Sequence, residues 1–263
     1  MAAEKIYITA RWRMRCVTAV IAAFLTANVS GISPIHLEPR PGRAHGFVDD
    51  EGREILFHGS SAVVKGPPWY PDHSTFSDDI SMSRKDFEWM QRLGLNFLRL
   101  GVMWAGTEPT RGHYNETYLD QIDAVVKLAA EHGVYVMLDM HQDGLSEYFC
   151  GEGLPEWAVR RITKEHWYEP FKKPFPEPFS KLDNKTDFYI EPRLEGATLP
   201  TAQACGSHKH GASFGESTYE SAQAYQGLYD NWNGTGDAFV AMWAKVASRF
   251  KVREPPLCGH ASC

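Results

Sequence analysis

The sequence lacks the patterns of several common kinds of site. It has no CxxC pair and no cluster of cysteine and histidine with the spacing of zinc ligands, so we expect no metal. It has no basic excess, because 27 Lys and Arg stand against 33 Asp and Glu. A nucleic-acid-binding face needs clustered basic side chains. We therefore expect no nucleic acid partner, and no motif indicates a cofactor.

Long apolar runs are also scarce. One lies near the N-terminus, at residues 16–29, after three arginines and before the small residues Ser30 and Gly31. A basic flank, a short apolar run and small residues are the layout of a secretory signal. The run is short for a membrane span, so residues 1–31 are predicted to be a signal peptide, with an uncleaved anchor as the alternative. We expect a secreted protein, or one in the lumen of the secretory or lysosomal pathway.

Two further features fit the secretory route. Three Asn-x-Thr triplets predict N-glycosylation, at Asn115, Asn184 and Asn233. Four cysteines remain when the one in the leader is set aside, an even number for an oxidising compartment. Cys150 and Cys205 bracket a loop-rich region, and we predict that they form a disulfide, because closing a loop of about fifty residues restrains the unfolded chain.

The middle of the chain alternates strands with helices. Residues 46–50 and 53–57 suggest a hairpin around Glu51-Gly52, after a proline-rich entry. Buried strands are then predicted within Ile55–Lys65, at Asn96–Trp104 and at Val134–Met140. The helices between them run from the capping box of Ser83 and Asp86 to Gly94, and from Tyr118 to His132. This alternation predicts an α/β fold with a parallel sheet.

The pattern dissolves after the third strand. Residues 144–236 read as one long loop with a hint of a helix at Ser217–Leu228. A connection of that length is usually a functional lid or a mistaken assignment. A helical period returns from Phe239 to Phe250, and residues 252–263 form an unpatterned tail. The sequence therefore predicts three strands and three main helices.

Polar residues gather where the third strand ends. The apolar run from Val134 is followed by Asp139, His141, Gln142 and Asp143. A buried parallel strand that delivers such side chains at its C-terminal end is how an α/β barrel presents a site. The alternative is that Asp139 and His141 only satisfy one another and the loop backbone, as buried polar groups must.

This region also carries a family resemblance. The DMHQD run and the LPEWA motif at Leu154–Ala158 resemble endoglycoceramidases, as do the segments GSSAVVKGPPW, LNFLRLGVMW and DAFVAMWAKVASRF. These enzymes are retaining glycosidases of glycoside hydrolase family 5, with a (β/α)8 TIM barrel. The resemblance spans about Gly46 to Phe250. It implies that residues 46–251 are the amino-terminal part of such a barrel, with only the first three βα units present.

The resemblance implies roles for five residues. Lys65, His141 and Asp143 would bind sugar hydroxyls, Arg99 would pair with the nucleophile, and Trp232 would be a stacking platform. The ordinary alternatives are a surface lysine, a core tryptophan and a buried Arg–carboxylate pair. For Arg99 both roles can hold, since an arginine in an apolar strand needs a carboxylate partner anyway.

The resemblance also implies two catalytic glutamates, one following an asparagine at the end of the fourth strand and one ending the seventh. The sequence has no Asn-Glu-Pro triplet and nothing that matches a seventh strand. Replacement by Asp139, Asp143, Glu147, Glu152 or Glu156 is disfavoured, because an acid/base pair must flank the scissile bond. We therefore expect this chain to be an inactive, truncated form.

The family sets the expected substrate. Endoglycoceramidases cleave the bond between oligosaccharide and ceramide in glycosphingolipids, so the expected ligand is a glycosphingolipid or another β-glycoside, with membrane-surface contact made through the lipid. Two alternatives stay open. One is a family 5 enzyme for steryl glucosides or β-glucans, and the other is a non-catalytic sugar-binding decoy.

An incomplete barrel also predicts poor stability. The third strand would keep an open edge, and Val136, Leu138, Leu98 and Leu100 would have apolar surface without a partner. At about 25 cal/mol per Å², a few hundred Å² would forfeit several kcal/mol. We therefore expect aggregation, retention in the secretory pathway or dependence on a partner.

Overall fold

A computed structural model describes residues 32–39, 42, 44–149, 151–163 and 219–250. Several predictions lie outside these residues: the leader, the Cys150–Cys205 disulfide, the Asn184 glycan and the tail. They stay predictions. Within the described residues no helix is both long enough and apolar enough to cross a membrane.

The main body is a parallel sheet of three strands with the order β3-β4-β5. A separate two-stranded antiparallel sheet, β1-β2, precedes it. In chain order the elements are β1 (Ile35–Glu38), β2 (Gly46–Asp49), β3 (Gly59–Ala62), α2 (Arg84–Arg92), β4 (Phe97–Val102), α3 (Trp104–Thr107), α4 (Glu116–Glu131), β5 (Tyr135–Met140), the 3-10 helix η1 (Glu147–Phe149), α5 (Glu156–Thr163), α7 (Tyr219–Tyr229), the 3-10 helix η4 (Trp232–Gly234) and α8 (Thr235–Phe250). The three predicted barrel strands and the helices between them are confirmed.

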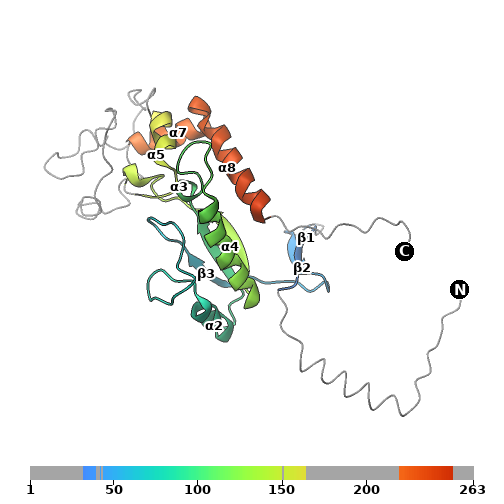
Figure 1. Ribbon diagram of the computed structural model, residues 1–263. Coiled ribbons are helices and arrows are strands. Elements are labelled where there is room, and N and C mark those ends of the chain that lie inside the picture. The colour runs from blue at the N-terminus through green and yellow to red at the C-terminus, as the bar shows by residue number, and fades with distance from the viewer. Residues whose placement is uncertain (1–31, 40–41, 43, 150, 164–218, 251–263) are drawn as a thin grey trace, which may run out of the picture.

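Helices pack on one face of this sheet (Figure 1). Alternate residues of β4 point to that face, and Leu98, Leu100 and Val102 have no exposed surface. The apolar side of α4 belongs to the same core, as does Phe87 of α2. Because successive strand side chains alternate between faces, Arg99 points to the opposite face, and its side chain is 38% exposed.

This arrangement corrects the predicted consequence of the open edge. Among the described strands, β5 pairs only with β4, as expected for an incomplete barrel. However, the prediction that Leu98, Leu100, Val136 and Leu138 lack a partner is wrong. Leu98 and Leu100 lie on the helix-covered face and are fully buried, and Val136 and Leu138, which pair with them, are partly buried against the same core. The open face instead exposes Met137, at 44%. The uncovered apolar surface on this sheet is therefore smaller than the sequence predicted.

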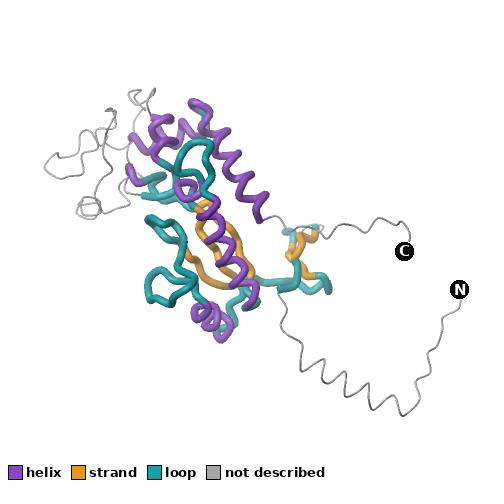
Figure 2. The backbone as a smooth tube through the Cα atoms, in the orientation of Figure 1, coloured by secondary structure: helices purple, strands orange, loops and turns teal. Residues whose placement is uncertain are grey.

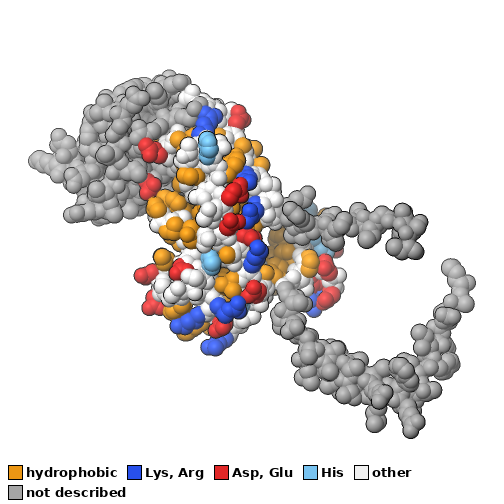
Figure 3. Space-filling model, in the orientation of Figure 1, with side chains coloured by type: hydrophobic (Ala, Val, Ile, Leu, Met, Phe, Trp, Pro, Cys, Tyr) orange, Lys and Arg blue, Asp and Glu red, His pale blue; other side chains and the backbone are white. Residues whose placement is uncertain are grey.

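The helix α8 packs beside α3 and α4. Its Phe239 contacts the Trp104 ring with the centroids 5.4 Å apart. Along the surface, acidic side chains of α4 pair with basic ones of α8, as Glu116 does with Lys245 and Asp120 with Arg249. Basic and acidic side chains intermingle on this face in Figure 3. Exposed pairs of this kind add little stability, so apolar contacts hold α8 in place.

The hairpin near the N-terminus differs from the prediction. The turn at Glu51-Gly52 is confirmed, since Gly52 has a φ of 75° and Val48 bridges to Glu54. The main partner of β2 is β1, which lies in the segment expected to be a proline-rich entry. Prolines flank the four residues of β1, so the strand is too short to show an alternating pattern.

The hairpin joins the sheet at the end opposite to the site described below. The ring of Phe57 contacts Phe97, the first residue of β4, at 5.0 Å, and Tyr135, the first residue of β5, at 5.5 Å between centroids. The same ring contacts Phe47 of β2 at 5.1 Å. Figure 2 shows the hairpin beside the main body, connected through loop segments.

The predicted long loop contains helices. The helix hinted at by Ser217–Leu228 is confirmed as α7, but α5 was not predicted. With eight residues, α5 covers little more than two turns, which is too few for an apolar repeat to stand out. Pro155 directly before it is a helix-start signal. Residues 144–236 are therefore not one structureless connection.

Candidate functional site

Polar side chains from three strands meet at one edge of the parallel sheet. Lys65 follows β3, Arg99 lies in β4, and Asp139 lies in β5, which His141 and Asp143 follow. The C-terminal ends of parallel strands lie side by side, and this is where open and closed α/β folds place their sites. The structure thus brings four of the five sequence-predicted binding residues to the same edge, all except Trp232.

Lys65 is held by two carboxylates. Its ammonium forms an ion pair with Asp143, and its Nζ lies 3.0 Å from Oε1 of Glu152. The hydrogen bond from Lys65 lowers the pKa of Asp143, so this carboxyl is ionised at neutral pH. The same bond raises the pKa of Lys65. Lys65 is therefore not a free surface lysine, which was the ordinary alternative.

Glu152 is the site residue that the sequence-based prediction missed as a member of the binding set. It is 5% exposed, and its backbone N–H donates to the carbonyl of Asp143 at 2.7 Å. Burial raises the pKa of Glu152, and the ion pair with Lys65 opposes that rise. The sequence signal was the glycine on each side of it, at Gly151 and Gly153.

Those two glycines are required by close approach of the chain. A Cβ on Gly151 would lie 1.8 Å from the carbonyl oxygen of Asp143, and Gly153 has a φ of 129°. No L side chain fits at either position without a shift of the backbone. The glycines therefore let the returning loop lie directly against the end of β5, with Glu152 between them.

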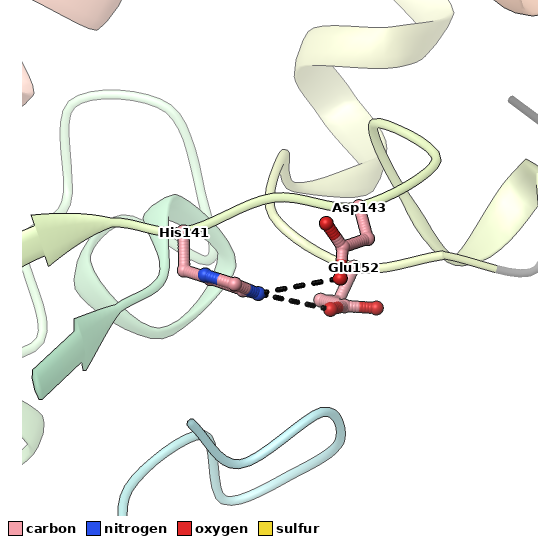
Figure 4. A group of neighbouring side chains, drawn as sticks. All are labelled: His141, Asp143 and Glu152. Carbon is pink, nitrogen blue, oxygen red and sulfur yellow. Dashed lines mark ion pairs between the residues drawn. The ribbon is translucent and has the colours of Figure 1, made fainter. Parts of the chain in front are cut away.

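His141 lies between two groups of charges. Its Nε2 is 3.4 Å from Oδ2 of Asp143 and 3.5 Å from Oε1 of Glu152 (Figure 4). Its Nδ1 is 3.1 Å from Oδ2 of Asp139 and 3.3 Å from Nη2 of Arg99. Carboxylate oxygens therefore face both ring nitrogens of His141.

Arg99 has the carboxylate partner that its place in an apolar strand required. Its Nη2 lies 2.6 Å from Oδ2 of Asp139. The guanidinium and His141 thus share one carboxylate, which links the strand β4 to the end of β5. Its implied role as the partner of a nucleophile stays a prediction.

The cluster has the shape of a small cation site, but the cation is part of the chain. His141, Asp143 and Glu152 offer ligand atoms within 4.8 Å of one another. The ammonium of Lys65 contacts both carboxylates of this set. A metal ion there would have to displace a positive charge that is already paired. The donor set therefore fits an ammonium group rather than a metal.

The same contact bears on hydrolysis. Carboxylate oxygens of Asp143 and Glu152 lie within 4.8 Å of each other, and retaining glycosidases use two carboxyl groups about 5–5.5 Å apart. Both project from one strand end and its loop, and both bind Lys65. A scissile bond between them would have to replace the ammonium. The arrangement instead offers donors (Lys65, His141) beside acceptors (Asp143, Glu152), which suits the hydroxyls of a sugar.

A hollow lies next to this cluster, lined in part by Met140 and Gln142. Between His141 and Asp143, the side chain of Gln142 reaches toward α7, where its Oε1 accepts a 2.6 Å hydrogen bond from Tyr225. A largely apolar cavity of about 490 Å³ opens there between β5, α7 and α8. Its lining includes Met140, Leu145, Leu154, Leu228, Tyr229, Phe239 and Val240.

The remaining predicted residues lie elsewhere. Trp232 lies in η4 and packs, partly buried, against the hydrophobic core, so its role as a stacking platform stays a prediction. Asn115 is the N-cap of α4, where its Oδ1 accepts from the backbone N–H of Tyr118 at 3.1 Å. Asn233 lies in η4 with a φ of 54°. Glycosylation at both positions stays a prediction.

Comparisons with known proteins agree with this fold. The family model described as cellulase, glycosyl hydrolase family 5, matches residues 48–185. An endoglycoceramidase of Hydra vulgaris is 36% identical over 242 residues, which are 92% of this chain and 43% of that protein. One of Cyanea nozakii is 37% identical over 235 residues, 89% of this chain and 42% of that protein.

Solved structures give the same picture of the fold. The crystal structure of endogalactoceramidase superposes with a TM-score of 0.53 at 22% identity, over 82% of this chain and 41% of that one. The chain thus spans less than half the length of the relatives that it matches. Among the described strands β5 pairs only with β4, which agrees with a match to part of a longer barrel.

Proposed function

Because this chain belongs to glycosyl hydrolase family 5, we propose that it is the amino-terminal, sugar-binding part of a glycosidase of endoglycoceramidase type. Its substrate would be a glycosphingolipid, bound by the sugar. The similarity to two endoglycoceramidases across about nine tenths of this chain supports the proposal. The observation that carries it is the cluster of Lys65, His141, Asp143 and Glu152 at the C-terminal edge of the sheet.

The geometry of the cluster explains how a sugar would be held. A hydroxyl placed above Lys65 would accept a hydrogen bond from the ammonium and donate one to Asp143. The side chains of Lys65 and Asp143 are 54% and 46% exposed, so both can reach a ligand. Charge-assisted hydrogen bonds of this kind are stronger than neutral ones, which suits an uncharged polar ligand.

We also propose that this chain alone does not hydrolyse the glycoside. The described carboxylates of the cluster, Asp139, Asp143 and Glu152, each lie against a cation of the chain. A general acid needs a proton to donate at the working pH and must reach the substrate. Asp143 has a lowered pKa, and Glu152, whose pKa is raised by burial, is only 5% exposed. The family's acid/base and nucleophile glutamates have no counterpart in this sequence, which has no Asn-Glu-Pro triplet and no segment that matches a seventh strand.

Sugar binding is tested by titrating the full chain with methyl β-lactoside, with calorimetry and NMR as the two readouts. Binding is expected in the wild type and lost in His141→Ala, which removes the group between both charge pairs. The matched control is Glu147→Gln, at the first residue of η1, where the described residues show no contact with Lys65 or His141. Absence of any response in a folded wild type at millimolar lactoside would refute the proposal.

Hydrolysis and specificity are tested on a panel. Lactosylceramide, a steryl glucoside and a β-glucan oligosaccharide are each incubated with the chain, and released sugar is measured against a blank. We expect no release from any of them. Release that His141→Ala abolishes would show an active enzyme. Binding of the steryl glucoside or the β-glucan in preference to the glycosphingolipid would favour the other family 5 specificities.

We further propose that the protein travels the secretory route and meets its lipid at a membrane surface. The layout of residues 1–31 and the three sequons support this. At Asn115 the cap uses the side-chain oxygen, so it does not involve the amide nitrogen, to which an N-glycan would be attached. Expression in a secreting cell should give a product that shifts on treatment with an amidase that removes N-glycans. An unshifted, intracellular product would count against it.

A further inference from the structure

The four members of the cluster differ in how firmly they are held. Lys65 and Asp143 are about half exposed, with side-chain exposures of 54% and 46%. The side chain of Glu152 is 6% exposed and that of His141 is 10%. A long, half-exposed lysine side chain has many rotamers in the absence of a fixed partner. The buried carboxylate is therefore the element that can define where the ammonium lies.

The geometry points to Glu152 as the positioning residue of this sugar site. Its carboxylate holds the ammonium of Lys65 from below, with Nζ and Oε1 3.0 Å apart. The same oxygen lies 3.5 Å from Nε2 of His141. One buried oxygen thus lies next to both donors that the site offers to a sugar, within ion-pair distance of Lys65 and facing the Nε2 of His141, which has no hydrogen-bond partner among the described residues. This inference rests on the proposed function for the ligand, but not for the geometry.

The backbone around Glu152 explains why its position is fixed. The loop is tied to β5 through the bond from Glu152 N–H to the Asp143 carbonyl, and to α3 through a 2.8 Å bond from Ala105 N–H to the Gly153 carbonyl. Both are main-chain bonds on either side of the carboxylate. The fold of the loop therefore does not depend on the charge of Glu152, and an isosteric amide at this position keeps it.

The charges around the cluster show what the carboxylate balances. Lys65 after β3 and Arg99 of β4 supply two positive charges, and Asp139, Asp143 and Glu152 from β5 and its loop face them. Arg99 is already paired with Asp139. When Glu152 is neutral, the half-exposed Asp143 is the one carboxylate partner that the described residues leave to Lys65. The ammonium of Lys65 then has no buried anionic partner that defines its position.

The experiment compares Glu152→Gln, Glu152→Asp and the control Glu147→Gln in the full chain. Lactoside affinity is measured by calorimetry, and the ring nitrogens of His141 are followed by long-range ¹H–¹⁵N NMR without any sugar. In Glu152→Gln we expect affinity to fall by about 10–100-fold, the same order as the loss when a residue that orients a metal ligand is removed. The Nε2 resonance of His141 should shift in the same variant.

The other two variants define the cause. Glu152→Asp restores the charge at a shorter reach and should recover part of the affinity. Glu147→Gln should leave both the affinity and the His141 resonances as in the wild type. If Glu152→Gln does not fold, the inference is judged on Glu152→Asp, whose His141 resonances and affinity must then change. Wild-type affinity and unchanged ring signals in a folded Glu152 variant would overturn it.

The two proposals fail in different ways. If the wild-type chain binds no lactoside, the proposed function is wrong, and the sugar-free NMR comparison still decides whether Glu152 orients His141. If the wild type binds lactoside but Glu152→Gln binds equally well, the proposed function stands and the positioning role is wrong. A fall in the melting temperature without a change in His141 would show a role confined to folding.

Discussion

The two faces of the parallel sheet differ in what they contact. On the helix-covered face, Leu98 and Leu100 are fully buried in the core that the apolar sides of α2 and α4 share. On the other face, Arg99 pairs with Asp139 and Met137 is 44% exposed. One face is a well-packed apolar core. The other carries charged side chains, next to the edge of β5 that pairs with no other described strand.

This difference separates stability from function. Apolar burial contributes most of the free energy of folding, and the helix-covered face supplies it. The charged face contributes little net stability, since half-exposed ion pairs are worth roughly 0–1 kcal/mol. Substitutions on the two faces should therefore affect different measurements, and the following predictions test that separation.

The largest effect is expected for Leu98→Ala on the helix-covered face. Removing a fully buried leucine leaves a cavity and costs about 2–5 kcal/mol of unfolding free energy. Met137→Ala on the open face, the matched control, should cost less than about 1 kcal/mol, because its side chain is largely in solvent. Urea unfolding of both variants checks this. Equal losses would mean that the open face is covered in solution.

A smaller loss is expected for Tyr118→Phe. The hydroxyl of Tyr118 is buried, accepts from the N–H of Met103 at 2.9 Å and donates to the carbonyl of Trp69 at 3.3 Å. Phenylalanine leaves both groups without this partner and should cost about 1–3 kcal/mol. Tyr114→Phe, on a partly exposed tyrosine of the same region, is the control and should change stability little. The urea midpoints of the two variants give the comparison.

Lys65→Met should separate binding from folding. The lysine is half exposed, but its loss leaves the buried Glu152 carboxylate without its cation, so the unfolding free energy should fall by about 1–3 kcal/mol while the chain still folds. Lactoside binding should be lost, because the ammonium is the central donor of the site. Calorimetry and thermal unfolding of the same sample check this. Retained binding would remove Lys65 from the site.

The smallest effect is a pH dependence. Lys65 lowers the pKa of Asp143 in the folded chain, so their pair stabilises the fold above the unfolded value of about 3.9. This stabilisation is lost as the pH falls through the lower, folded pKa. Wild type should therefore exceed Asp143→Asn by at most about 1 kcal/mol at pH 7, and the difference should vanish in acid. A difference that grows as the pH falls would contradict the pairing.

The sequence predicted the strands and helices that have a clear period of apolar residues. Strands β3 to β5, with α2 and α4 between them, follow from periodic apolar residues and from caps such as Ser83 and Gly94. The strand β1 and the helix α5 are too short for an apolar pattern to repeat within them, so both were missed. Side chains of a strand alternate between the two faces of the sheet. The prediction that Leu98 is exposed did not take into account that it points to the face covered by helices.

The sequence predicted those site residues that are polar and lie at, or directly after, the end of a predicted strand. Lys65, His141 and Asp143 follow strands, and the family resemblance gave them roles. Glu152 lies eleven residues beyond His141 and reaches it because the loop turns back at its glycines. Such a return is a long-range contact, which local patterns do not encode.

The most direct test of the central claim is an NMR titration of the isotope-labelled chain with methyl β-lactoside. The account predicts that the signals of Lys65, His141, Asp143 and Glu152 move together with one dissociation constant. The amides of Leu98 and Leu100, whose side chains face the helices, should stay in place. Shifts confined to the helix-covered side, with the four cluster residues unmoved at saturating lactoside, would contradict it.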